Sequence, residues 1–435
     1  RHPRGMAHVC HGLARACTVN PDGVATVEYA SCDAATRDQP PRLTSWREFH
    51  RAVQALYTRL RARLGATPTS KPRVAILAGN GCGMLQSLYA IAAAGAIAVP
   101  LNVRWEPAEL ASALSDTTPQ LFLADEAQFS KAEAAVSQCA WPVALEPLAM
   151  GQRELLPEEL LHEELGELVV SAEEPSDAAT SGVAFILFTS GTSGKAKGVV
   201  ITHAMAVCQA MAKVCAPVGI AQDSVFLSVV PLFHIGGIST SLAVTMMGGT
   251  HVFSPPNSKS ARSRPLKSPL LYPLVDSLAR IAVNTLVVVP TMLHMVTSEL
   301  TRMGRRLPNI RLVLVGGGSL SALPSLFQEA KALMPGAVVV QTYACTEAGS
   351  SVTFGLLTEA VLTLEGAACF AGQPVPHAEI RIRLKDDESR DLSKEAVGEI
   401  LTRGPHVTPG YWRGPDVPCD SSRIRNGWLH TGRLV

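Results

Sequence analysis

The chain has 435 residues, more than one hydrophobic core usually supports, so two or three domains or subdomains are expected. Hydrophobic residues make up 47% of it and charged residues 17%, which describes a globular protein and excludes global disorder. The 38 basic residues nearly balance the 37 acidic ones, so charge gives no case for nucleic acid or an anionic membrane as a partner.

Short apolar, β-rich runs alternate with helical patterns, which is typical of a parallel sheet covered by helices. Strands are expected at 74–78, 96–100, 184–188, 225–230, 286–289, 312–315 and 338–342, with a helix at 84–94. The longest apolar stretch, 88–101, is too short to span a membrane and is interpreted as a buried helix followed by a strand. Short strands with turns at 377–384 and 398–403 indicate a small β subdomain.

The expected fold class is α/β, with two doubly wound subdomains and a small β subdomain. The predicted boundaries are 1–175, 176–365 and 366–435. Residues 254–273 are dense in Pro, Ser and basic side chains and are expected to be a disordered insertion. Open α/β sheets bind ligands at the carboxyl ends of their strands, so the Gly-, Ser-, Thr- and His-rich loops found there are where a site belongs.

The segment 184–200 reads AFILFTSGTSGKAKGVV, an apolar strand followed by a loop of hydroxyl, glycine and lysine residues. Glycines allow close approach to an anion, and successive backbone N–H groups form an anion-binding nest. Hydroxyl groups and the two lysines add donors and positive charge, so the loop suits a polyphosphate. It is neither a Walker loop, because Ala196 follows Lys195, nor a Rossmann fingerprint, because the GxGxxG spacing is missing.

This loop resembles the phosphate loop of the adenylate-forming superfamily, which includes acyl-CoA synthetases, luciferases and nonribosomal-peptide adenylation domains. Further motifs of that superfamily follow in order and extend the resemblance from about Asp22 to the end of the chain. They are PLFHIGG (231–237), VGGGSL (315–320), TYACTEAG (342–349), GEILTRGPHVTPGYW (398–412) and GWLHTGRLV (427–435).

The resemblance implies an acid–thiol ligase that uses ATP, Mg²⁺ and coenzyme A. A carboxylic acid attacks the α-phosphate of ATP, and the thiol of coenzyme A then attacks the acyl carbon of the adenylate. Nucleotide contacts are implied for Thr189, Ser190, Gly191, Thr192, Ser193, Gly194, Lys195, Gly316, Gly317, Gly318 and Tyr343, the last stacking on adenine. The implied catalytic residues are His234 at the acyl carboxylate, Thr346 at the α-phosphate, Lys197 and Glu347. Mg²⁺ is assigned to Glu347 and Thr192, because it prefers hard oxygen ligands beside phosphates.

Within the superfamily, HIGGIS, GQPVPHAEI and TRGPHV resemble the plant and algal 2-succinylbenzoate–CoA ligases of phylloquinone and menaquinone synthesis. Small residues after His234 favour a compact aromatic acid. Ligases for another aryl or fatty acid, and a non-catalytic adenylate-binding protein, remain alternatives. Residues 1–21 carry several basic and no acidic residues, so a transit peptide and an ordinary terminus both fit. A soluble intracellular protein is expected, in the chloroplast or peroxisome if the plant and algal resemblance holds. The oligomeric state stays open.

Two departures from the superfamily stand out. Arg433 occupies the position of the ribose-binding aspartate, and loss of such a charged hydrogen bond costs about 1.5–3 kcal/mol. The sequence also stops at Val435, before the superfamily's mobile carboxyl-terminal domain. We therefore expect this polypeptide, as given, to be nearly inactive in adenylation.

Overall fold

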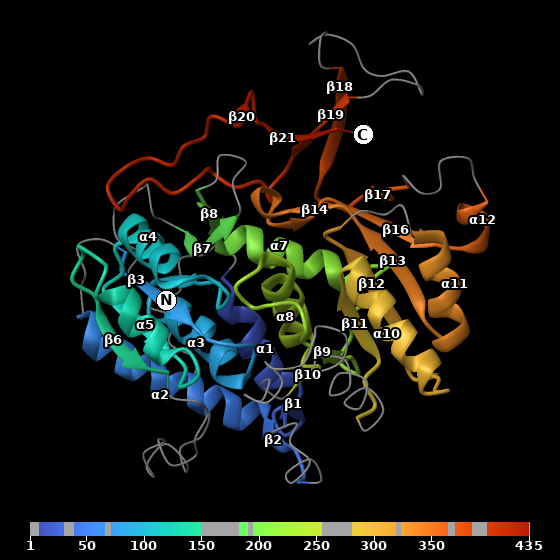
Figure 1. Cartoon of the computed structure of the whole chain (residues 1–435), viewed down its shortest axis with the longest axis horizontal. Helices are drawn as coiled ribbons and strands as arrows, with labels where there is room; N and C mark the ends of the chain where they lie inside the picture. Colours follow the sequence, from blue (N-terminus) through green and yellow to red (C-terminus); the bar gives the residue numbers. More distant parts are fainter. Residues whose placement is uncertain are drawn as a thin grey trace.

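The computed structural model describes residues 8–29, 39–65, 71–148, 182–189, 195–254, 281–318, 323–363, 370–384 and 398–434. Two large sheets lie side by side in these ranges, and a small sheet lies across their upper edge in Figure 1. The predicted insertion falls outside the described residues except for Ser254. No described helix is both long and apolar enough to cross a membrane.

The first sheet has the strand order β6-β5-β3-β4-β7-β8. All neighbours pair in parallel except β7 and β8, which form an antiparallel hairpin at the edge. Its strands are β3 (Arg73–Leu77), β4 (Ile97–Pro100), β5 (Leu121–Ala124), β6 (Ala144–Pro147), β7 (Val183–Thr189) and β8 (Lys197–Thr202).

The second sheet has the order β17-β16-β13-β12-β11-β9-β10-β1-β2 and is parallel from β13 to β1. Its strands are β1 (Val24–Glu28), β2 (Arg42–Ser45), β9 (Val225–Leu227), β10 (Thr250–Phe253), β11 (Thr285–Val288), β12 (Leu312–Gly316), β13 (Val338–Thr342), β16 (Thr353–Leu357) and β17 (Gln373–Pro374). The small sheet is antiparallel and comprises β18 (Glu379–Leu384), β19 (Gly398–Arg403), β20 (Ile424–Arg425) and β21 (Trp428–Leu434).

Helices fill the space between the two large sheets and cover their outer faces (Figure 1). The central helices are α1 (Cys10–Val19), α2 (Trp46–Leu64), α3 (Cys82–Ala93), α7 (His203–Val214) and α8 (Ile235–Met247). On the first sheet the outer face carries α4 (Pro107–Thr117) and α5 (Phe129–Val136), and on the second it carries α10 (Pro290–Arg302) and α11 (Leu323–Leu333). A short helix, α12 (Glu359–Leu362), follows β16.

Successive side chains of each strand point to opposite faces of the sheet, so they pack alternately against the central helices and the outer helices. In β3, Val74 and Ile76 belong to the central core, whereas Ala75 and Leu77 pack under the outer helices. Both faces of the sheet are covered, so every residue of β3 is buried. The expected α/β fold is confirmed, and so is the interpretation of 88–101, since every residue of α3 is buried and β4 follows it.

The sheets do not divide the chain at the segment boundaries that the sequence suggested. Strands β1 and β2 come from the first predicted segment, yet they pair into the second sheet. Strands β7 and β8 come from the second segment and complete the first sheet through β4. Strand pairing of this kind depends on long-range contacts, which local sequence patterns do not encode.

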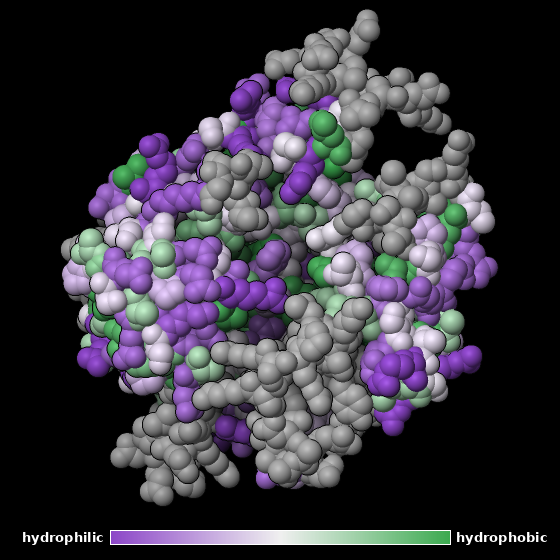
Figure 2. Space-filling model, viewed as in Figure 1, coloured by the Kyte–Doolittle hydropathy of each residue, from purple (hydrophilic) through white to green (hydrophobic). Residues whose placement is uncertain are grey.

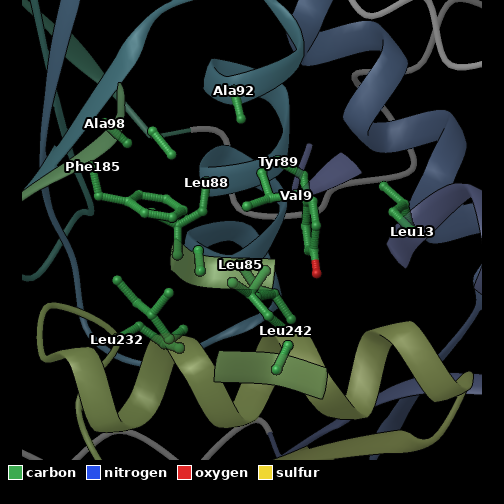
Figure 3. Packing of buried hydrophobic residues seen from close by; sticks show 14 of the residues in the cluster. Val9, Leu13, Leu85, Leu88, Tyr89, Ala92, Ala98, Phe185, Leu232 and Leu242 are labelled. Carbon is green, nitrogen blue, oxygen red and sulfur yellow. The ribbon is translucent and has the colours of Figure 1, made fainter. Parts of the chain in front are cut away.

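Figure 3 shows the apolar packing between α3 and α8, with Phe185 from β7 entering the same cluster. Phe185 is 1% exposed, so its replacement by alanine removes buried area and leaves a cavity. We expect Phe185→Ala to lower the free energy of unfolding by about 3–5 kcal/mol in equilibrium urea denaturation. Leu43→Ala at a 57% exposed position is the control and should change it by less than about 0.5 kcal/mol. Equal losses of unfolding free energy in the two variants would contradict the placement of Phe185 in the central core.

Candidate active site

The predicted phosphate loop connects β7 and β8, which pair in antiparallel fashion. Thr189, the last residue of β7, pairs with Lys197, the first of β8. Residues 190–194 lie outside the described part of the chain, so the predicted nest of backbone N–H groups stays a prediction. Lys195 Nζ lies 2.9 Å from Asp116 Oδ1 in an exposed ion pair. Exposed pairs contribute little to stability, so a phosphate can replace Asp116 at small cost.

Three side chains from distant segments meet beside this hairpin. The Tyr411 hydroxyl donates to Glu347 Oε1 at 2.7 Å, and Lys197 Nζ lies 5.4 Å from the centre of the Tyr411 ring. Burial, followed by the hydrogen bond to Glu347, raises the pKa of Tyr411, so its hydroxyl remains a donor at neutral pH. Tyr411 lies at the GYW end of the 398–412 motif, and it links Lys197 to Glu347.

Glu347 lies in η3 (Thr346–Ala348), a single turn between the short strands β14 (Ala344–Cys345) and β15 (Ser350–Ser351). The backbone oxygen of Glu347 accepts from Thr408 N at 2.9 Å, which ties this turn to the segment that carries Tyr411. The predicted α-phosphate contact, Thr346, is buried at 8% exposure in the same turn.

A buried glutamine on α7 fixes the η3 turn. Gln209 Nε2 donates to the backbone oxygens of Ala348 (3.0 Å) and Ser351 (2.8 Å). Its Oε1 accepts from Ser351 N at 3.2 Å. One side chain thus satisfies three backbone groups that the fold has removed from water. The sequence offered no signal for this role, because an isolated Gln in a helix has no motif.

The three glycines of the VGGGSL motif begin at the carboxyl end of β12, beside the end of β13. Gly316 pairs with Thr342, and a Cβ atom at Gly316 would lie 2.5 Å from Thr342 Cγ2. Gly317 has φ +75°, which favours glycine, and a Cβ atom at Gly318 would lie 3.0 Å from Pro290 Cδ. Tyr343 follows β13 directly, and burial raises its pKa to about 12. The predicted adenine contacts are therefore neighbours at one edge of the second sheet.

His234 caps the amino terminus of α8, where its Nδ1 accepts from Gly236 N at 3.4 Å. His234 is exposed, yet the protein around it partly desolvates the ring and thereby lowers its pKa. The imidazole is therefore neutral at pH 7. Asn80, which follows β3, fastens the loop before it by donating to Ser228 O and Val230 O and accepting from Leu232 N, all within 2.9 Å.

Arg433, in β21, is exposed, and its charge lies close enough to Tyr343 to lower that residue's pKa slightly against the larger effect of burial. A cation thus stands near the predicted adenine contact. Figure 2 shows that the surface is hollowed between the two halves of the molecule, beneath the small sheet. The segments described above come from the edges of both sheets and from the small β subdomain.

Residues 13–412 match the family described as AMP-binding enzyme. This match covers most of the chain, so the protein belongs to the AMP-binding enzyme family, the adenylate-forming superfamily that its motifs resemble.

Two relatives indicate where in this family the chain is placed. It is 32% identical over 453 residues to the chloroplastic/peroxisomal 2-succinylbenzoate–CoA ligase of Arabidopsis thaliana, covering 98% of this chain and 74% of that protein. It is 28% identical over 364 residues to the 2-succinylbenzoate–CoA ligase of Bacillus mycoides strain KBAB4, covering 83% of this chain and 65% of that protein. The chain therefore spans about two thirds to three quarters of the length of these relatives.

Solved structures share the fold. The o-succinylbenzoate coenzyme A synthetase of Bacillus subtilis in complex with AMP has a TM-score of 0.71 at 24% identity, covering 97% of this chain and 94% of that chain. A putative long-chain-fatty-acid CoA ligase of Rhodopseudomonas palustris has a TM-score of 0.74 at 22% identity, covering 98% and 95%. The two scores are similar, so the fold by itself does not select the acid.

The Gln209 contacts predict a local effect. We expect Gln209→Leu to speed amide hydrogen exchange at Ser351 about five- to tenfold, because a hydrogen bond of about 1 kcal/mol or more is lost there. Peptide-resolved exchange over residues 346–353 measures this. Gln138→Leu, at an exposed glutamine that bonds only within its own turn, is the control. Unchanged protection in Gln209→Leu would show that other contacts hold the η3 turn.

Proposed function

We propose that the protein activates 2-succinylbenzoate with ATP, forms an acyl-adenylate, and transfers the acyl group to coenzyme A. The observation that carries this is the meeting of Lys197, Tyr411 and Glu347 beside the hairpin of the predicted phosphate loop. The sequence likeness to 2-succinylbenzoate–CoA ligases supports the choice of acid.

In the first half-reaction a carboxylate oxygen attacks the α-phosphorus, a new O–P bond forms, and pyrophosphate leaves. Negative charge gathers on the phosphates, so donors fixed in advance stabilise the transition state most. Lys195 and Lys197 flank the hairpin turn and supply positive charge, and Thr346 is assigned to the α-phosphate. His234, neutral and facing solvent at the start of α8, is assigned to orient the attacking carboxylate.

In the second half-reaction the thiol sulfur of coenzyme A attacks the acyl carbon. The C–S bond forms, the thiol proton passes to water, the C–O bond to phosphate breaks, and AMP leaves with the electron pair. Tyr343 is assigned to hold the adenine ring, and Gly316, Gly317 and Gly318 allow the nucleotide to approach the backbone closely.

Mg²⁺ fits the groups present. Glu347 Oε1 accepts from Tyr411, while its other oxygen has no hydrogen bond among the described contacts. No group of three or more acidic, His or Cys side chains capable of holding a metal occurs in the described ranges. Mg²⁺ typically binds through one or two carboxylates together with phosphates and water, and Glu347 would supply one such carboxylate. Bound there, it would neutralise phosphate charge, with Thr192 as the second proposed ligand.

An adenylate-binding protein without catalysis is the second candidate. It is favoured by Arg433, a cation near Tyr343 where the superfamily has an aspartate for the ribose. The likeness to the Arabidopsis protein supports the chloroplast or the peroxisome as the proposed compartment.

Calorimetric binding tests the proposed site. The probe is a non-hydrolysable sulfamoyl analogue of the 2-succinylbenzoyl-adenylate, compared with the matching long-chain fatty-acyl analogue. We expect the first to bind at least about 100-fold more tightly, since a compact aromatic pocket has no room for a long chain. Equal binding of both would contradict the assignment of the acid, and binding of neither would contradict the nucleotide site.

A second prediction concerns Glu347. Glu347→Gln keeps the side-chain shape and an acceptor for Tyr411 but removes the charge. We expect ATP binding in the presence of Mg²⁺ to weaken at least about tenfold, because Mg²⁺ binds neutral amides poorly, while AMP binding without metal changes less than threefold. Glu359→Gln, at an exposed carboxylate on α12, is the control. Equal weakening of ATP and AMP binding would show that Glu347 has a structural role only.

A further inference from the structure

A buried lysine lies beneath the candidate site. Lys213 is 1% exposed, on the same face of α7 as Gln209, one turn further on. Its Nζ donates to Ser350 Oγ at 3.4 Å. None of the carboxylates that the structure describes forms an ion pair with it, and burial is the cause that lowers its pKa to about 7. An uncompensated buried ammonium is costly, so its position requires an explanation beyond packing.

The cluster around Lys213 is rich in donors and poor in acceptors. Ser239, from α8, donates its hydroxyl to Ser350 Oγ at 3.0 Å. Ser350 Oγ thus accepts from both Lys213 and Ser239, which leaves its own hydroxyl hydrogen to donate elsewhere. Both serines are buried. An ionised carboxylate accepts hydrogen bonds and donates none, so it is complementary to these three groups.

The surroundings of the cluster carry no compensating negative charge in the described ranges. His377 lies near enough for the charge of Lys213 to contribute, after burial, to lowering its pKa to about 4. The ring of His406 lies 5.0 Å from that of His377, and burial lowers its pKa to about 4 as well. These groups are neutral or cationic, so the local potential favours an anion.

The cluster also lies next to residues assigned to the reaction. Ser239 follows His234 by five residues, which places it roughly 7.5 Å further along α8. Ser350 follows Glu347 by three residues, and its backbone φ of 137° is unusual for a residue with a side chain. Such strained conformations concentrate at functional sites. An acid whose reacting carboxylate meets His234 would therefore extend toward Lys213.

We propose that Lys213, Ser239 and Ser350 bind the second carboxylate of a dicarboxylic acid substrate, the one that is not activated. This rests on the proposed function and defines its substrate class. In 2-succinylbenzoate six covalent bonds separate the two carboxyl carbons, a span of at most roughly 7.6 Å, since three bonds of an extended chain cover about 3.8 Å. That span matches the separation of His234 and Ser239 along α8. A monocarboxylic fatty acid would leave Lys213 buried without a counter-charge.

The test pairs two ligands with three variants. The ligands are the sulfamoyl analogue of the 2-succinylbenzoyl-adenylate and the same molecule with hydrogen in place of the ring carboxylate. We expect the unmodified protein to bind the first about 10- to 100-fold more tightly, the effect of a hydrogen bond to a charged group. In Lys213→Met the two affinities should come within about threefold of each other, with the second ligand binding as before.

Lys131→Met is the matched control, because Lys131 donates to Val103 O at 2.8 Å on the outer face of the first sheet. It should keep the full preference. Thermal unfolding reports whether each variant is folded. Ser239→Ala removes one hydrogen-bond donor and no charge, so it should reduce the preference for the ligand with the ring carboxylate about three- to tenfold. This variant replaces Lys213→Met in the test if Lys213→Met does not fold.

The outcomes separate this inference from the function on which it rests. The role of Lys213 would be overturned if the unmodified protein bound both ligands equally. It would also be overturned if Lys213→Met and Ser239→Ala both kept the full preference for the ligand with the ring carboxylate. Either result would leave adenylate binding intact. Binding of neither ligand would overturn the proposed function itself.

Discussion

The architecture depends on a layer of helices buried between two sheets. Every residue of α3 is buried, α2 packs against it, and α7 and α8 pack against each other. Leu85 and Leu88 of α3 share an apolar cluster with Leu242 of α8. Because the inner faces of both sheets use the same helices, neither sheet forms a complete core by itself. Removal of apolar area from water in this shared layer is the main favourable term, at about 25 cal/mol per Å².

The shared layer fixes where the site can form. The parallel strands of each sheet end at one edge, and open α/β sheets bind their ligands in the loops at that edge. Two side-chain amides hold loops of the candidate site in place through hydrogen bonds to their backbone. Asn80 follows strand β3 of the first sheet and holds the loop before His234, whereas Gln209 lies on α7 in the central layer and holds the turn that carries Glu347. Both act on backbone groups, so the loops are positioned independently of what binds there.

The electrostatic effect of each lysine in the candidate site depends on how deeply that lysine is buried. Lys195 and Lys197 lie near the surface, where an anion can replace solvent or a weak partner such as Asp116. Lys213 lies deep, where charge is expensive and a matching anion has a large effect. The superficial lysines suit a polyphosphate that many nucleotides share. The deep lysine suits discrimination between acids, since a site with buried polar groups rejects a ligand that leaves them unpaired.

The sequence alone determined the local elements and the class of protein. Apolar runs and their spacing located β3, α3, β4 and β13 within one or two residues, because burial on one or both faces imposes its pattern directly on the chain. The motifs named Lys197, Glu347, Tyr343 and His234, since phosphate and nucleotide chemistry needs particular residue types in order.

Only the tertiary structure decided which strands share a sheet, and that Tyr411, Gln209, Asn80 and Lys213 stand beside those motif residues. Their hydrogen bonds to these segments join positions 64 to 152 residues apart. Such contacts are made by packing in three dimensions and leave no local pattern. An isolated glutamine or lysine in an amphipathic helix looks the same in sequence whether it meets water or a buried partner.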